Sequence, residues 1–273
     1  MENITLTRKY LHHKLFSKLP YLYHSPQKNK LGTILFLHGL GACKEHWIEV
    51  ANNFLEYEII IPDFIGFGEN SIPDPKFCTI PNQKNQILYF LEQLNLNTED
   101  LIFVAHSMAG APVLLVLKEL MSSFKAHIHV EGNLDDGDLF FSKKITSKPL
   151  ESYKSIGHQK FIQYFSSEES GIPKTFQKSF KNTSANVIYY TASSLITWST
   201  GTILLDIIDL IPKDKLLFLF GERNKGKFSS EKSLLEKEFL VEYVKNCGHS
   251  IDQENPTGLA KKIHCFIKRG SIK

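Results

Sequence analysis

The chain has 273 residues, of which 42% are hydrophobic, and its 32 lysines and arginines stand against 29 aspartates and glutamates. This composition is enough to bury a full core, and a net charge of +3 is too small to indicate a nucleic-acid-binding surface, so we expect no nucleic-acid partner. No apolar run approaches the roughly 20 residues of a transmembrane helix, and the first residues lack the apolar segment of a secretory signal, which together predict a cytoplasmic protein.

Short apolar runs alternate with helical patterns from residue 33 onward. We expect buried strands at residues 33–37, 58–61, 101–105, 126–130 and 216–220. Continuous apolar runs of this length are typical of parallel strands that are covered on both faces. Helical spacing over 82–94 and an apolar helix over 109–121 lie between them. The pattern predicts an α/β fold with a doubly wound, mostly parallel sheet, which binds ligands at the carboxyl ends of its strands.

The alternation breaks between residues 132 and 209, where a usual connection needs far fewer residues. We interpret 133–209 as an inserted helical cap, and 1–132 and 210–273 as the two parts of the core. Aromatic residues of the cap favour an apolar acyl or aryl substrate group, although aromatic residues at helical spacing also pack cores. They are Tyr153, Phe161, Tyr164, Phe165, Tyr189, Tyr190 and Trp198.

The most informative segment is Ala105-His106-Ser107-Met108-Ala109-Gly110, at the passage from a buried strand into a helix. Small residues two positions before and after Ser107 permit the tight turn of a nucleophile elbow. That turn places the serine oxygen at a helix N-terminus, where the helix dipole favours developing negative charge. A serine in such a place also serves as a helix N-cap, so this segment alone does not identify a nucleophile. Two other Gly-containing turns favour the nucleophile. These are Leu37-His38-Gly39-Leu40-Gly41 and Pro62-Asp63-Phe64-Ile65-Gly66-Phe67-Gly68, each at the end of a predicted strand.

With these three turns and the late Asn246-Cys247-Gly248-His249-Ser250, the chain resembles the α/β-hydrolase family over nearly its whole length. The resemblance implies that Ser107 is the nucleophile and His249 the general base. It also implies that the backbone N–H groups of Leu40 and Met108 form the oxyanion hole. We interpret His38 and His106 as structural.

The sequence departs from the family pattern at the acidic member of the triad. The family usually places an aspartate just after the strand predicted at 216–220, where this chain has Asn224. An amide cannot stabilise an imidazolium, and the equivalent change in the serine protease template costs about 10⁴ in turnover. We therefore assign the acid to Glu131, at the end of the strand next to the elbow, and expect Asn224→Ala to change turnover little. This placement is similar to one group of haloalkane dehalogenases, although their aspartate nucleophile is replaced here by serine. Glu222, Asp252 or no functional acid are the alternatives.

We expect no metal and no cofactor. His127 and His129 lie on one strand face, but no further ligands follow at recognisable spacing and no H-E-x-x-H is present. No G-x-G-x-x-G follows a strand. Four cysteines lie far apart, without the spacing of a zinc site or a disulfide framework.

The sequence thus predicts a serine hydrolase that cleaves a small carboxylic ester or a related acyl compound through Ser107, His249 and Glu131. Peptidase, thioesterase and carbon–carbon bond hydrolase activities use the same fold and stay open. An aminopeptidase requires carboxylates for the substrate ammonium, for which Glu151, Glu168 and Glu169 are the cap candidates. A hydrolase-like protein that has lost activity and binds a ligand is the alternative from another class. The sequence does not indicate an oligomeric state.

Overall fold

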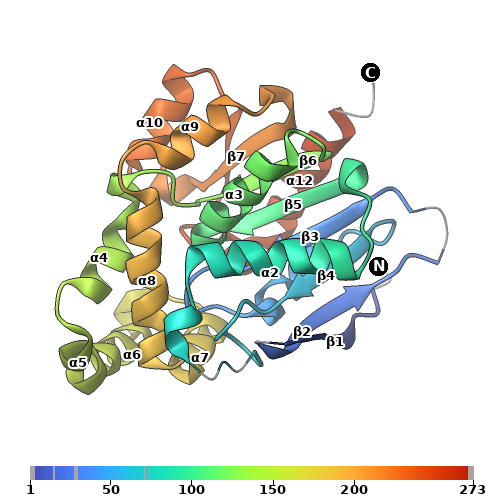
Figure 1. Cartoon of the computed structure of the whole chain (residues 1–273). Coiled ribbons are helices and arrows are strands. Elements are labelled where there is room, and N and C mark those ends of the chain that lie inside the picture. Colours follow the sequence, from blue (N-terminus) through green and yellow to red (C-terminus); the bar gives the residue numbers. More distant parts are fainter. Residues whose placement is uncertain (1–3, 15, 28–29, 71, 73, 270–273) are drawn as a thin grey trace.

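One eight-stranded sheet forms the centre of the computed structural model, which describes residues 4–14, 16–27, 30–70, 72 and 74–269 (Figure 1). The strand order is β1-β2-β4-β3-β5-β6-β7-β8. The strands are β1 (Thr7–His13), β2 (Ser17–His24), β3 (Thr33–Leu37), β4 (Glu58–Pro62), β5 (Leu101–His106), β6 (Ala126–Val130), β7 (Leu216–Gly221) and β8 (Val241–Val244). In this order, all neighbouring strands from β4 to β8 are parallel to each other. Strand β2 is antiparallel to both of its neighbours, β1 and β4. The predicted fold class is confirmed.

The five predicted strands are present as β3 to β7, with ends that agree within one residue. Alternate residues of β3 point into two separate hydrophobic layers: Leu35 and Leu37 face one, and Ile34 and Phe36 the other. Because both faces of the sheet are covered, the strands have no polar face, which explains their continuous apolar sequences. The β1–β2 hairpin was not predicted, since most of β1 is exposed and its sequence is polar.

Helices cover both faces of the sheet. The layer around α2 (Ile80–Gln93) and α3 (Gly110–Leu120) also includes residues of α10 (Ser229–Glu236). The opposite layer contains α1 (Ile48–Ala51), α11 (Ile251–Glu254) and α12 (Pro256–Arg269). Among the described residues, no helix combines the length and the apolar character that crossing a bilayer requires.

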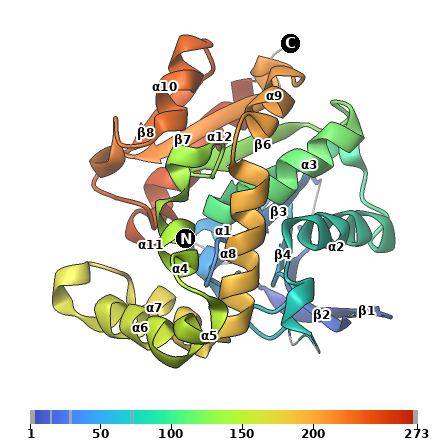
Figure 2. The same ribbon diagram turned by 60° about the vertical axis from the view of Figure 1, so that its left-hand side comes forward.

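The connection from β6 to β7 contains six α-helices, which we call the helical insertion. They are α4 (Phe140–Thr146), α5 (Leu150–Ser152), α6 (His158–Ser166), α7 (Lys174–Asn182), α8 (Ala185–Ser199) and α9 (Ile203–Asp209). Helices α4 to α7 lie beyond one end of the sheet, and α8 leads from them back toward α3 (Figures 1 and 2). Helix α9 then packs directly on α3. The domain limits at 133 and 209 stay a prediction.

Candidate active site

Ser107 lies at the sharp turn that follows β5. Its backbone has a φ of 54°, a left-handed conformation that costs energy for any residue except glycine. Ala105 and Ala109 beside it are fully buried, and Gly39 of the β3 loop lies so close that a Cβ there would be 3.0 Å from Ser107 Cβ. The turn therefore needs small neighbours, as the sequence pattern indicated.

The imidazole of His249 faces this serine. His249 follows β8 on a loop of residues 245–250, and its Nε2 lies 3.2 Å from Ser107 Oγ. Its side chain is 40% exposed, so the ring forms part of an accessible surface rather than of the core. The distance is within the range over which a base can take a proton from a hydroxyl.

Glu131 contacts the other nitrogen of the same ring. It follows β6 directly, has a φ of 42° and is 1% exposed. Its Oε2 lies 2.7 Å from His249 Nδ1, and its Oε1 accepts the Gly221 N–H at 2.7 Å. Asn224 Nδ2 donates to both carboxylate oxygens, at 3.1 and 2.9 Å. Segments after β5, β6, β7 and β8 thus converge at one edge of the sheet.

Burial and charge act in opposite directions on the His249 ring. Burial lowers the pKa of His249, but the hydrogen bond and the charge of Glu131 outweigh it, and the pKa lies above its ordinary value of 6.5. The charges of Asp252 and Glu254 act in the same direction. The site therefore stabilises an imidazolium, which is the species that forms when His249 takes a proton.

Neither of the two alternative acids has a hydrogen bond to the His249 ring in the described structure. Glu222 is exposed and its Oε2 accepts the Asn246 N–H at 3.2 Å. Asp252 is buried, and the described structure gives it no hydrogen bond to His249. Asn224, which sequence reasoning treated as inert, is the residue that the prediction missed. Only the position of Asn224 after β7 could have indicated this contact from the sequence.

Leu40 lies on the turn between β3 and α1, beside Ser107. Its backbone N–H has no hydrogen-bond partner among the described residues. Met108 is in the first turn of the helical segment after Ser107, where backbone N–H groups have no acceptor within the helix. Both predicted oxyanion donors thus belong to segments that adjoin the serine.

A buried ion pair fixes the loop that carries Leu40. Lys44 and Asp63 have fully buried side chains, with 2.7 Å between Nζ and Oδ2, and Asp63 Oδ1 accepts the Lys44 N–H at 2.8 Å. His38 supports the same region, because its Nε2 accepts the Phe64 N–H at 3.0 Å. Burial lowers the pKa of His38 to about 3, so the ring is neutral and its Nε2 can accept. The loops after β3 and β4 are therefore tied together behind the serine.

His106 and His129 also lie next to the turn that carries Ser107. His106 Nε2 donates to the backbone oxygen of His249 at 2.8 Å. His129 is buried, bonds His127 at 3.1 Å and packs against Gly110 so tightly that a Cβ there would be 2.2 Å from the ring. Burial lowers the pKa of His129 to about 4. These histidines are neutral packing residues of the elbow.

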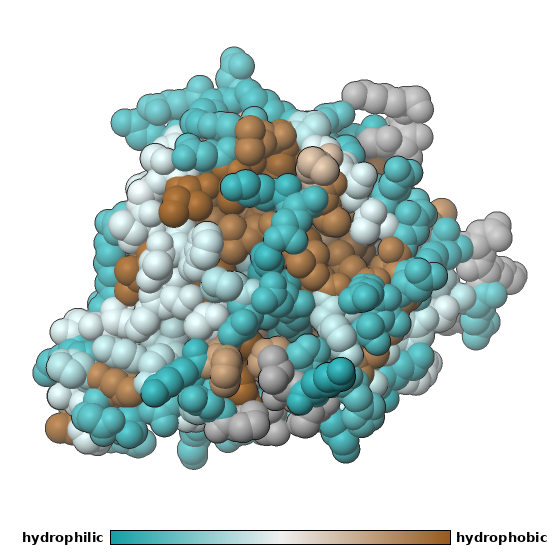
Figure 3. Space-filling model, viewed as in Figure 1, coloured by the Kyte–Doolittle hydropathy of each residue, from teal (hydrophilic) through white to brown (hydrophobic). Residues whose placement is uncertain are grey.

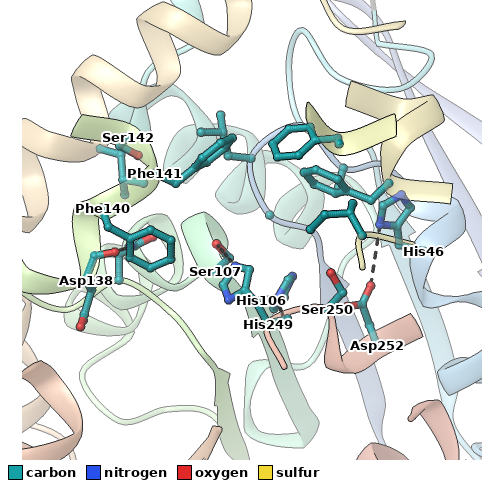
Figure 4. A pocket seen from close by; sticks show the side chains of 18 of the residues that line it. His46, His106, Ser107, Asp138, Phe140, Phe141, Ser142, His249, Ser250 and Asp252 are labelled. Atoms are coloured by element: carbon teal, nitrogen blue, oxygen red, sulfur yellow. Dashed lines mark hydrogen bonds and ion pairs between the residues drawn. The ribbon is translucent and has the colours of Figure 1, made fainter. Parts of the chain in front are cut away.

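A cavity of about 270 Å³ opens over Ser107 and His249 (Figure 4). Most of its wall is apolar and comes from the helical insertion. The apolar lining includes Leu40, Phe140, Phe141, Phe161, Tyr164, Phe165, Ile172, Phe176 and Leu195. The polar lining has His46, Ser250, Asp252 and Gln253, and also Asn133, Asp138, Ser142 and Lys144. Of the aromatic residues named from the sequence, Phe161, Tyr164 and Phe165 line this cavity.

The three carboxylates considered for an aminopeptidase do not take part. Glu151, Glu168 and Glu169 are exposed and are not among the residues that line the cavity. This arrangement gives the expectation no support, because these carboxylates lie in solvent and away from the residues around Ser107.

This chain is similar to known proteins both in sequence and in structure. The family model described as the alpha/beta hydrolase fold matches residues 32–146. Lipase 1 of Psychrobacter immobilis is 31% identical over 78 residues, which is 29% of this chain and only 24% of that lipase. A candidate lipase of Acinetobacter baumannii superposes with a TM-score of 0.74 and 20% identity, over 97% of this chain and 92% of the other. A thermophilic esterase of Thermogutta terrifontis gives 0.72 and 13%, over 97% and 99%.

Proposed function

The described structure has the α/β-hydrolase fold, and from this premise we propose that the chain belongs to that family and hydrolyses small carboxylic esters or related acyl compounds through a Ser107–His249–Glu131 triad. One observation carries the proposal. Two hydrogen bonds, of 3.2 and 2.7 Å, join the Ser107 hydroxyl, the His249 ring and the Glu131 carboxylate in the order that nucleophilic catalysis requires.

In the proposed reaction, His249 Nε2 takes the proton from Ser107 Oγ while that oxygen attacks the carbonyl carbon of the substrate. The resulting oxyanion accepts hydrogen bonds from the N–H groups of Leu40 and Met108, each worth on the order of 3 kcal/mol of the barrier. The imidazolium then protonates the leaving alcohol, and an acyl-serine remains. His249 then takes a proton from a water molecule as this water attacks the acyl carbon, and returns the proton to Ser107 Oγ as the bond to the serine breaks and the carboxylic acid is released.

Glu131 has a separate role in this scheme. Its carboxylate receives the Nδ1–H of His249, which fixes the tautomer with a free Nε2 and stabilises the imidazolium. The raised pKa of His249 supports this role. A loss of activity through the missing aspartate at 224 is not favoured, because a different carboxylate occupies the same contact.

The aromatic wall of the helical insertion supports an apolar substrate group, and we propose residues 133–209 as a cap over the core formed by 1–132 and 210–273. No observation favours peptidase, thioesterase or carbon–carbon bond hydrolase activity over ester hydrolysis. Turnover of p-nitrophenyl esters of increasing chain length, beside aminoacyl anilides and an acyl thioester, tests the assignment. We expect ester hydrolysis that is lost in Ser107→Ala. Faster cleavage of anilides or thioesters by the wild type would contradict it.

A further inference from the structure

Asp252 is a buried carboxylate without adequate partners. The residue is 3% exposed, and its Oδ2 accepts one hydrogen bond, from Gln253 Nε2 at 3.3 Å. Its Oδ1 is buried and has no hydrogen-bond partner among the described residues. Burying a carboxylate in this way costs free energy unless charge and hydrogen bonds compensate, and the described residues supply only one hydrogen bond to Asp252.

His46 does not supply that compensation. Its Nδ1 lies 3.8 Å from Asp252 Oδ2, beyond hydrogen-bond distance, and lies 2.5 Å from Gln253 Nε2, which can only donate. The Nδ1 is therefore an acceptor, and Nε2 carries the proton toward Ser179 Oγ at 3.1 Å. Burial also lowers the pKa of His46, which keeps the ring neutral. Among the described residues, no lysine or arginine pairs with Asp252.

Ser250 adds a second polar group at the same place. It is 8% exposed, and the described structure gives its hydroxyl no hydrogen bond. Figure 4 shows Ser250 and Asp252 together on the side of His46, away from Phe140 and Ser142 across the cavity. Both residues line the same cavity as Ser107 and His249.

We propose that Asp252 and Ser250 form a subsite for a protonated amine on the substrate. The inference rests on the proposed ester hydrolysis and narrows its substrates to acyl compounds that carry a cationic, hydrogen-bond-donating group beside an apolar one. A negative charge without a cation favours such a group over a hydroxyl, because a charged donor forms the stronger hydrogen bond. The aromatic side chains that line the same cavity accept the apolar part.

Two matched pairs of esters test the subsite. In each pair a dimethylammonium group replaces an isopropyl group of the same shape, so that only charge and donor capacity differ. One pair places it in the alcohol, as 2-(dimethylamino)ethyl and 3-methylbutyl butanoate. The other places it in the acyl part, as ethyl 4-(dimethylamino)butanoate and ethyl 5-methylhexanoate. At a pH where the amine is protonated, we expect kcat/KM to favour the cationic ester of one pair by about 10-fold or more.

Variants separate the subsite from the catalytic groups. Asp252→Asn is expected to bring that ratio close to one, and Ser250→Ala to lower it. The ratio is informative because Asp252 also raises the pKa of His249, and that effect is shared by both esters of a pair. Glu168→Gln, which removes an exposed carboxylate of the helical insertion, is the control and should leave the ratio unchanged.

Three outcomes would overturn the inference. The first is equal turnover of both members in both pairs, with neutral esters still hydrolysed, which leaves the proposed function intact. The second is a cationic preference that persists in Asp252→Asn and Ser250→Ala. The third is a higher kcat/KM for 2-hydroxyethyl butanoate than for the cationic ester, since it would assign the subsite to a hydroxyl. Absence of turnover with every ester contradicts the proposed function itself.

Discussion

Asn224 donates its side-chain amide to both carboxylate oxygens of Glu131, at 3.1 and 2.9 Å. The turn after β7 thus contacts the carboxylate that follows β6. An amide suits this contact, because it supplies hydrogen bonds to the carboxylate without adding a second negative charge. The Asn224 amide and the Glu131 carboxylate are therefore complementary. For this reason we revise the expectation that Asn224→Ala changes turnover little.

We predict that Asn224→Leu lowers kcat by about 10-fold, since an isosteric apolar side chain removes hydrogen bonds to a charged group that are worth about 1.5–3 kcal/mol. The KM for a neutral ester should stay near the wild-type value, because Asn224 does not line the cavity. Steady-state kinetics with a p-nitrophenyl ester measure both constants. Glu222→Gln in the same turn is the control, and a larger loss there than in Asn224→Leu would favour Glu222 as the acid.

Glu131→Gln should reduce turnover by about 10⁴, as loss of the triad acid does in the serine protease template. The amide keeps the size of the side chain but cannot stabilise an imidazolium. Activity of purified Glu131→Gln, with circular dichroism to establish that the variant is folded, measures the effect. Turnover within 10-fold of the wild type would remove Glu131 from the mechanism.

We expect kcat/KM to decrease toward low pH, with the midpoint of this decrease above pH 6.5. His249 acts as a base only when neutral, and its pKa lies above 6.5 because Glu131 outweighs the effect of burial. Activity therefore falls as the pH decreases through that raised pKa. Removing the Glu131 charge lowers the pKa, so an NMR titration of His249 in Glu131→Gln should show its midpoint at lower pH than in the wild type. A midpoint that does not move would contradict this coupling.

The buried ion pair of Lys44 and Asp63, next to the loop that carries Leu40, predicts a stability effect. Lys44→Met leaves the Asp63 carboxylate buried without its cation, which should lower the free energy of unfolding by about 3–5 kcal/mol. Lys84→Met is the control, because its pair with Glu119 is partly exposed and such pairs contribute about 0–1 kcal/mol. Urea denaturation of the two variants measures the difference. Equal losses would show that Lys44 is not required to balance Asp63.

The sequence predicted the central strands well because β3 to β7 are buried on both faces, which leaves continuous apolar runs. It did not predict β1, whose polar residues resemble those of a loop. The position of Ser107 followed from local sequence, since the elbow needs small residues on either side. The contacts of Asn224 and the place of Asp252 depend on how the turns after β7 and β8 are folded, and no local pattern encodes that.

The nucleophile is tested most directly by labelling with a fluorophosphonate, followed by mass spectrometry of the digested protein. The proposed chemistry predicts one modified peptide with the label on Ser107, no label in Ser107→Ala, and greatly slowed labelling in His249→Ala. A label on another residue, or labelling of Ser107→Ala at the wild-type rate, would contradict the assignment.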